Sequence, residues 1–231
     1  MVTPPKCTEG VVCTCGVCLR TLLASSLFAL ALAAGPVDHH ANARRLVAEA
    51  EQTANPIRLF LLALDIRKEL EAALAEKPDD GEVRLDLVRF FTVTPRVAGG
   101  DLDAARAHAA KLAELDPPLG HFARGYMAYR QKDFGVARIA LREAIRTTKS
   151  PSTRTLAMRW LGWLSQESQQ WDDAFAIFEE LGDPYEIART SVFCTCRLAQ
   201  GRAAIDAHLK AKPDDKEAKK LRDKLTRPAK P

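Results

Sequence analysis

The sequence contains none of the short motifs that mark common enzyme active sites. G-x-S-x-G, H-E-x-x-H, the Walker phosphate loop and G-x-G-x-x-G are all missing. Its 5 histidines include no pair at a zinc-type helical spacing. His39 and His40 are adjacent, and adjacent helical residues point apart, so we expect a polar segment there, with a metal site as the alternative. The sequence therefore predicts a protein that is not an enzyme and needs no cofactor.

Charge of one sign and aromatic side chains are also scarce. Lys and Arg number 34 against 30 Asp and Glu, a formal net charge of +4. Nucleic-acid binders cluster such charges, so this balance argues against a nucleic-acid partner. Aromatic residues make up 6% of the chain, while hydrophobic residues reach 47% and charged residues 28%. This composition is typical of a soluble globular protein.

The first 36 residues lack a run long enough to span a membrane. The uncharged apolar segment Thr21–Ala34 follows Arg20 and is shorter than the roughly 20 residues that a spanning helix needs. It ends in Ala31-Leu32-Ala33, a small-x-small pattern that a signal peptidase could cleave. Residues 1–36 therefore predict a bacterial signal peptide and export to the periplasm. The alternative is an uncleaved anchor in the inner membrane, which would be the chain's one association with a membrane.

Cysteine is confined to two clusters. Four cysteines precede the apolar segment, where nothing in the sequence builds a metal site, so we interpret residues 1–16 as an over-extended start. Cys194 and Cys196 lie two apart on an expected helix, so their side chains should diverge and a mutual disulfide would need distortion. We expect buried small hydrophobes there, with a redox or metal-binding protein as the alternative.

From Asp38 onward the chain is an almost continuous helical pattern with regular punctuation. Four sites pair a capping residue with proline at the first helical position: Asn55-Pro56, Asp116-Pro117, Ser150-Pro151 and Asp183-Pro184. Capping-box spacing occurs at Asp79/Glu82, Asp183/Glu186 and Asp214/Glu217. Helix starts at similar intervals predict an array of helix pairs.

The clearest pair runs from Ser150 to Leu181. Its Leu161-Gly162, Trp171, Ala174 and Phe178 have the spacing of a tetratricopeptide (TPR) repeat, which this stretch resembles. Small Gly and Ala let two helices approach closely, and aromatics fill the space around the contact. Matching small residues upstream are Ala105, Gly125 and Ala137. The alanines Ala105, Ala137 and Ala174 follow one another at 32 and 37 residues, near the family period of about 34.

The resemblance implies an all-α, right-handed superhelical solenoid over residues 37–226. It would hold four to five antiparallel helix pairs and a C-terminal capping helix, Asp214–Thr226, before a frayed tail at 227–231. The fifth pair, Pro184–Gln200 with Arg202–Lys212, matches the family least. The loop Thr92–Gly100 is longer than the family's turn. It is a candidate functional segment, although a tolerated insertion is the commoner explanation.

In this family the first helices of successive pairs line a concave groove that holds a segment of a partner. The resemblance therefore implies a protein-binding scaffold whose partner is another protein or peptide, an acidic one given the arginines. The Lys/Asn clamp of some relatives is missing, so binding of chaperone tails does not carry over. The alternative is that the aromatics pack between repeats. The implied groove residues are Leu85, Arg89, Phe122, Tyr126, Tyr129, Arg130, Arg159, Trp163 and Gln166.

Overall fold

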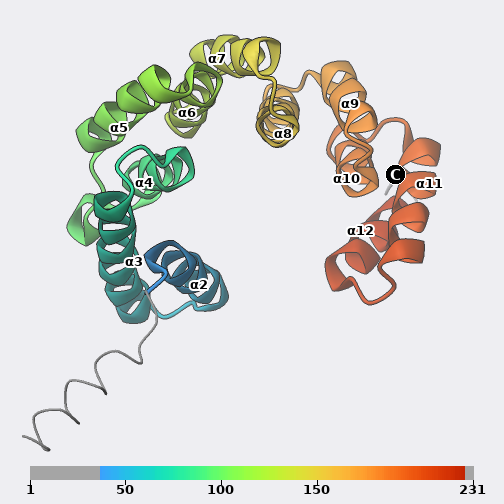
Figure 1. Cartoon of the computed structure of the whole chain (residues 1–231). Coiled ribbons are helices and arrows are strands. Elements are labelled where there is room, and N and C mark those ends of the chain that lie inside the picture. The colour runs from blue at the N-terminus through green and yellow to red at the C-terminus, as the bar shows by residue number, and fades with distance from the viewer. Residues whose placement is uncertain (1–36, 227–231) are drawn as a thin grey trace, which may run out of the picture. The chain divides into compact units, whose positions relative to one another are not determined.

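The computed structural model describes residues 37–226, and every regular element within that range is a helix (Figure 1). The expected signal peptide and C-terminal tail, residues 1–36 and 227–231, lie outside the described residues. The described residues from His39 onward form one compact unit. No helix in the described range is long and apolar enough to cross a membrane. The helices are α2 (His39–Gln52), α3 (Pro56–Glu76), α4 (Gly81–Val93), the 3-10 turn η1 (Arg96–Ala98), α5 (Leu102–Leu115), α6 (Pro117–Arg130), α7 (Phe134–Thr147), α8 (Pro151–Glu167), α9 (Trp171–Glu180), α10 (Pro184–Cys194), α11 (Leu198–Ala211) and α12 (Lys216–Thr226).

Helix starts follow the capping chemistry of the sequence. All four predicted caps with a following proline are confirmed: the side chains of Asn55, Asp116, Ser150 and Asp183 each accept a backbone N–H of the first turn. Two predicted capping boxes are wrong by one residue. Asp80 rather than Asp79 caps α4, and Asp215 rather than Asp214 accepts the Ala218 N–H of α12. In both places the chain makes one more turn residue before the helix begins.

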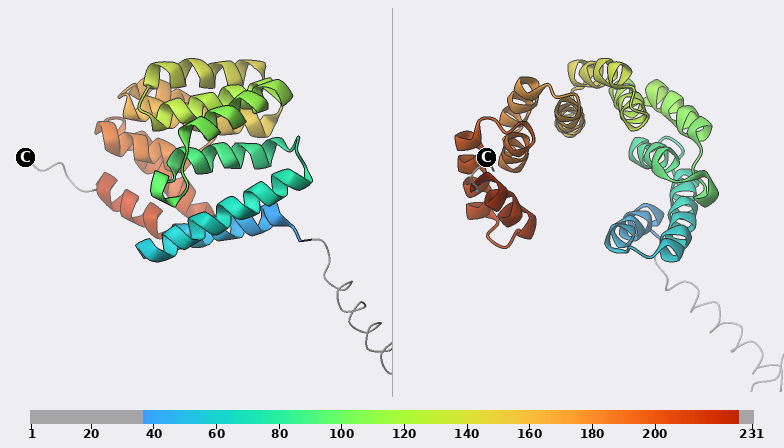
Figure 2. Two further views of the ribbon diagram at one scale, coloured as in Figure 1. Left: turned by 90° about the vertical axis from the view of Figure 1, so that its left-hand side faces the viewer. Right: turned by 180° about the vertical axis from the view of Figure 1, so that it is seen from behind.

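Helices that are adjacent in sequence pack on each other, which confirms an array of helix pairs. The even-numbered helices α4, α6, α8 and α10 form an inner layer, and α5, α7, α9 and α11 form an outer one (Figures 1 and 2). Within the inner layer α4 also contacts α6, and α6 contacts α8. The first helices of these three pairs therefore touch one another as well as their own partners, while α10 packs on the C-terminal helix α12.

Small residues mark where the two helices of a pair come closest. A Cβ on Gly125 would lie 2.8 Å from Leu141, and one on Gly162 would lie 2.5 Å from the Phe178 ring. Both contacts join residues sixteen apart in sequence, so the two pairs share one packing geometry. Further repeat positions are also buried: Ala105, Ala137 and Ala174 at 0% exposure and Leu161 at 6%.

The fifth pair departs from its predicted boundaries. The helix was expected to run from Pro184 to Gln200 and break at Gly201, but α10 ends at Cys194. Thr195 and Arg197 take left-handed backbone angles, with φ of 53° and 48°, and they reverse the chain. Gly201 instead lies inside α11, where a Cβ would come 2.5 Å from Ser191 of α10. Its small size permits a close helix contact rather than a helix end.

Two separate apolar clusters stabilise the unit. The larger runs from α2 to α8 and includes Leu62, Leu87, Phe122 and Leu141. The smaller joins α10, α11 and α12 through Ala188, Ile205, Leu221 and Leu225. Between α8 and α10 the packing is polar, and this joint carries part of the candidate site described next.

Candidate functional site

A ladder of aromatic rings runs across the inner layer from α6 to α8. The ring centroids of Phe122 and Tyr126 lie 6.5 Å apart, and those of Tyr126 and Trp160 lie 4.8 Å apart. Trp160 also meets Tyr129 at 5.2 Å and Trp163 at 5.0 Å, both edge to face. Edge-to-face pairs contribute about 0.5–1.5 kcal/mol beyond the area they bury. The ladder therefore locks α6 against α8.

Much of the predicted groove lies inside this packing. Leu85, Phe122, Tyr126 and Tyr129 are at most 9% exposed, and Gln166 is 5% exposed. Most of their surface thus packs between repeats, the alternative that the sequence left open, and little remains for a partner. The contacts available to a partner fall on the polar residues around the ladder.

The Tyr129 hydroxyl is fixed at the edge of the ladder. It donates a hydrogen bond to the Glu167 carboxylate, which also accepts Lys132 Nζ at 2.8 Å. Burial, reinforced by the hydrogen bond and charge of Glu167, raises the pKa of Tyr129 well above its ordinary value. The hydroxyl therefore remains a neutral donor, and it helps to join α6 to α8.

Arginines border the ladder along the inner helices. Arg89 pairs with Asp86 at 3.0 Å, and its guanidinium lies 5.8 Å from the centre of the Phe122 ring. Arg130 is exposed and has no ion pair with any described residue. Arg159 reaches Asp183 at 3.8 Å, with 43% of its side chain exposed. Arg130 and Arg159 are therefore the least committed of these charges, and we call them the arginine pair.

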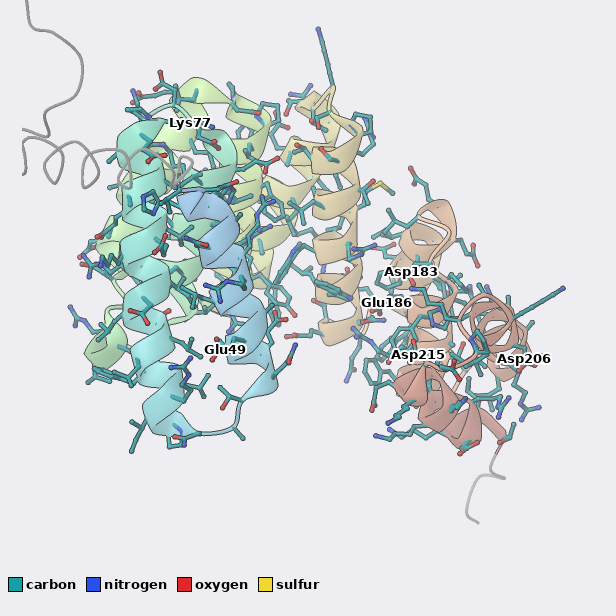
Figure 3. All side chains as sticks on the ribbon, turned by 60° about the horizontal axis from the view of Figure 1, so that its bottom comes forward. Glu49, Lys77, Asp183, Glu186, Asp206 and Asp215 are labelled. Carbon is teal, nitrogen blue, oxygen red and sulfur yellow. A yellow bond between two sulfur atoms is a disulfide. The ribbon has the colours of Figure 1, made fainter. Side chains whose placement is uncertain are left out.

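A buried polar network joins α8 to α10. Gln166 Nε2 donates to Thr190 Oγ1 at 2.7 Å and to Glu186 at 3.4 Å, while Arg189 Nη2 donates to Gln166 Oε1 at 2.9 Å. Figure 3 labels Asp183 and Glu186 at the start of α10, which these contacts turn toward α8. Burial raises the pKa of Glu186, and the charge of Arg189 opposes that rise.

Three buried donor atoms next to this network make no hydrogen bond of good geometry with described residues. The Nε atoms of Arg159 and Arg189 and the indole Nε1 of Trp163 are buried and make no hydrogen bond with described residues. Trp163 Nε1 approaches Glu186, and Arg189 Nε lies 3.0 Å from it, but neither meets hydrogen-bond geometry. Unpaired buried donors cost about 1–3 kcal/mol each. Two of these three donors therefore face Glu186, and Arg159 Nε is left without an acceptor among the described residues.

The sequence reasoning missed Glu186, Arg189 and Thr190. Arg189 and Thr190 lie three and four positions after Glu186 on α10, so both share a helical side with it. That polar stripe was visible in the sequence. The fifth pair matched the repeat pattern poorly, however, so α10 was not expected to continue the groove.

The two C-terminal cysteines form a disulfide, contrary to the expectation of free buried thiols. Cys194 and Cys196 have Cα atoms 5.1 Å apart, and the bond joins them across one residue. The prediction was wrong because α10 ends at Cys194, so Cys196 is not on the helix and its side chain can turn back. His39 and His40 pair with acids instead, with Glu69 at 2.7 Å and Asp86 at 3.0 Å. Within residues 37–226 no group of three or more metal-ligating side chains occurs.

Two comparisons of the sequence with known proteins find no match. A scan of protein-family models finds none that matches the chain, and a search of curated proteins finds no match either.

Proposed function

We propose that this protein is a non-enzymatic scaffold that binds a segment of another protein along its inner layer. The proposed architecture is a right-handed superhelix of TPR type, as the repeat residues suggest. The segment lies across α6, α8 and α10, with an acidic group at Arg130 and Arg159. Trp163 and Arg189 border the same place.

The supporting observation is the unfilled hydrogen-bonding capacity beside the aromatic ladder. Among the described residues Arg130 has no ion pair, Arg159 is held loosely by Asp183, and the Nε atom of Arg159 lacks an acceptor. Charge-assisted bonds to a carboxylate are stronger than neutral ones and shorter, so an acidic side chain fits this position. The rigid ladder beneath keeps the donors in place before a partner arrives, which lowers the entropy cost of binding.

Export to the periplasm is part of the proposal. The Cys194–Cys196 disulfide supports it, because disulfides persist in oxidising compartments and are rare in the cytosol. N-terminal sequencing of the protein from fractionated cells tests this point. A start near residue 37 in the periplasm is expected, an intact N-terminus in the inner membrane favours the anchored alternative, and an intact chain in the cytosol contradicts export.

The binding function is tested by removing the arginine pair. Arg130→Ala with Arg159→Ala should strip partners that co-purify with the wild type, because truncating a central arginine of an interface costs about 2 kcal/mol or more. Helicity and melting should remain near wild type, since both side chains are at the surface. The matched control is Arg124→Ala with Arg142→Ala, which removes the same charge but not from this face. Arg124 lines a hollow against Ala109 and Ala113 of α5, and Arg142 is on the outer helix α7. Equal retention of partners by both double variants would refute the assignment.

A further inference from the structure

The first two helix pairs enclose a hollow that the proposed function does not use. It measures about 980 Å³ and lies between α2, α3, α4 and η1. This volume is at the upper end of the range of about 300–1,000 Å³ for small-ligand sites, which are mostly apolar with a few placed polar groups. Most of its lining is apolar, including Ile66, Leu70, Phe90 and Ala98.

Side-chain bonds tie α2 to α3 and α4 in both of its halves, and in the second half Glu49 accepts a hydrogen bond from Arg58 Nε of α3 at 2.9 Å. His40 bonds Asp86 at 3.0 Å, Arg44 bonds Glu82 at 2.7 Å, and His39 bonds Glu69 at 2.7 Å. His39, His40 and Arg44 all lie in the first half of α2. In the second half Val47 and Ala50 line the hollow. The floor is α3, which contributes residues from Pro56 to Leu70, a span of about 21 Å at 1.5 Å per residue.

Large apolar side chains gather at the rim of the hollow and remain open to solvent. Val47 is 41% exposed, Phe60 40%, Val93 46% and Val97 85%. A single exposed apolar residue is ordinary, but a contiguous group around a concavity marks a binding site. Val93 and Val97 come from Thr92–Gly100, the loop that the sequence marked as a candidate functional segment. The structure gives this loop a position on the wall of the hollow.

The charged residues of the lining are two arginines and two acids. Arg44 and Arg89 both contact Asp86, at 4.0 and 3.0 Å, so this cluster has two cationic groups for one acid, while the second acid, Glu51, lies farther along α2. His40 also bonds Asp86. The second partner of Arg44, Glu82, does not line the hollow and has 75% of its side chain exposed. A ligand with an anionic head and a long apolar body matches this distribution.

We propose that the hollow binds a long-chain fatty acid, with the carboxylate at Arg44 and Arg89 and the chain along α3 toward Val93 and Val97. This is a second site, independent of the inner-layer function. An α-helix is about 10 Å or more across, so over a floor of 21 Å it would occupy roughly 1,600 Å³. A single extended acyl chain needs far less width, and the volume of about 980 Å³ holds it without displacing a helix.

The test uses cis-parinaric acid, a fatty acid whose fluorescence rises in apolar surroundings, and the full chain. We expect saturable binding that palmitate displaces. Val93→Asp with Val97→Asp should weaken binding at least tenfold, because the acyl chain would then meet two carboxylates. The control is Ile139→Asp, since Ile139 is another exposed apolar residue, at 73%, which lies on α7 and does not line the hollow. Melting followed by circular dichroism should be unchanged in both variants.

A second experiment tests whether Arg44 binds the carboxylate of the fatty acid. Arg44→Gln should weaken binding of both cis-parinaric acid and palmitate severalfold. The Kd of hexadecanol, calculated from displacement with the variant's own probe affinity, should be unchanged, because the alcohol has no charge to pair with Arg44. No saturable binding by the wild type, or equal binding by the Val93→Asp, Val97→Asp variant, overturns the proposal. A second copy of the chain could occupy the hollow instead of a fatty acid, and sedimentation of wild type and the Val93→Asp, Val97→Asp variant tests this. A wild-type dimer that becomes a monomer in the variant would show that the hollow is an interface between two copies, and would also overturn the fatty-acid proposal.

Discussion

At the scale of single residues, the repeat rests on glycines where helices touch. Gly162 is buried in α8 against the Phe178 ring of α9, which is itself fully buried. Gly135, near the start of α7, is exposed, and an added Cβ there would make ordinary contact with the Asp133 side chain at 3.7 Å. The two glycines therefore allow one substitution to be compared in two settings.

We expect Gly162→Ala to destabilise the protein by about 1–3 kcal/mol, the usual cost of overpacking a close contact. Gly135→Ala should be neutral or slightly stabilising, because alanine favours helix more than glycine does. Urea unfolding followed by circular dichroism measures both. Equal stability of the two variants would count against the close approach of α8 and α9.

His108 gives the unfolding free energy a pH dependence. Its ring stacks on Phe91 at 5.7 Å, and its Nδ1 lies 3.4 Å from Arg84 Nη1. Burial, with the charge of Arg84, lowers the pKa of His108. The unfolded chain therefore takes up a proton at a higher pH than the folded chain does. The contribution to stability is complete above the ordinary histidine value of about 6.5 and is lost as pH falls through the lowered pKa.

The corresponding prediction concerns the variant His108→Gln. The wild type should lose more unfolding free energy between about pH 7.5 and about pH 5 than the variant does, since glutamine does not titrate. Denaturant titrations at the two pH values give this difference. If wild type and variant lose the same unfolding free energy between the two pH values, the pH dependence comes from groups other than His108.

At the scale of helices, the joint between α8 and α10 is polar where the other helices pack through apolar clusters. Gln166 is at the centre of this joint, because its side-chain amide forms hydrogen bonds with Thr190, Glu186 and Arg189. Its removal leaves buried polar groups without partners, each costing about 1–3 kcal/mol. The smaller apolar cluster of α10 to α12 would then be held to the rest of the unit by fewer contacts.

We expect Gln166→Leu to lower stability by about 1–3 kcal/mol and to raise amide hydrogen exchange in α10 to α12 more than in α4 to α6. Gln170→Leu is the control, because Gln170 is exposed and its side chain makes no cap bond. A uniform rise in exchange over all helices would show that Gln166 does not act at this joint.

Helix boundaries were predictable where local chemistry sets them. Proline and a capping side chain fix the start of α6 and α8 whatever packs around them, so Asp116 and Ser150 were assigned correctly. The end of α10 depends instead on Cys194 and Cys196 meeting in space and on left-handed turns at Thr195 and Arg197. No local preference of threonine or arginine indicates such a turn, so the sequence pointed to Gly201.

At the scale of the whole repeat unit, the same limit applies to the site. The spacing of Tyr126, Tyr129 and Arg130 on α6 places them on one side of the helix. Which of them remains exposed depends on how α8 stacks against α6, and Trp160 covers both tyrosines. The periodic pattern identifies a helix face but not the ring that packs over it, so the site was predicted as a region rather than as a set of contacts.

The central claim is that this inner face binds an acidic segment. It is tested most directly by fluorescence anisotropy with a labelled glutamate-rich peptide, titrated with wild type and both double-arginine variants. We predict saturable binding that weakens with salt, a loss of at least tenfold for Arg130→Ala with Arg159→Ala, and near wild-type binding for Arg124→Ala with Arg142→Ala. Binding that falls equally in both variants would show attraction to net charge alone, and no binding by the wild type would contradict the claim outright.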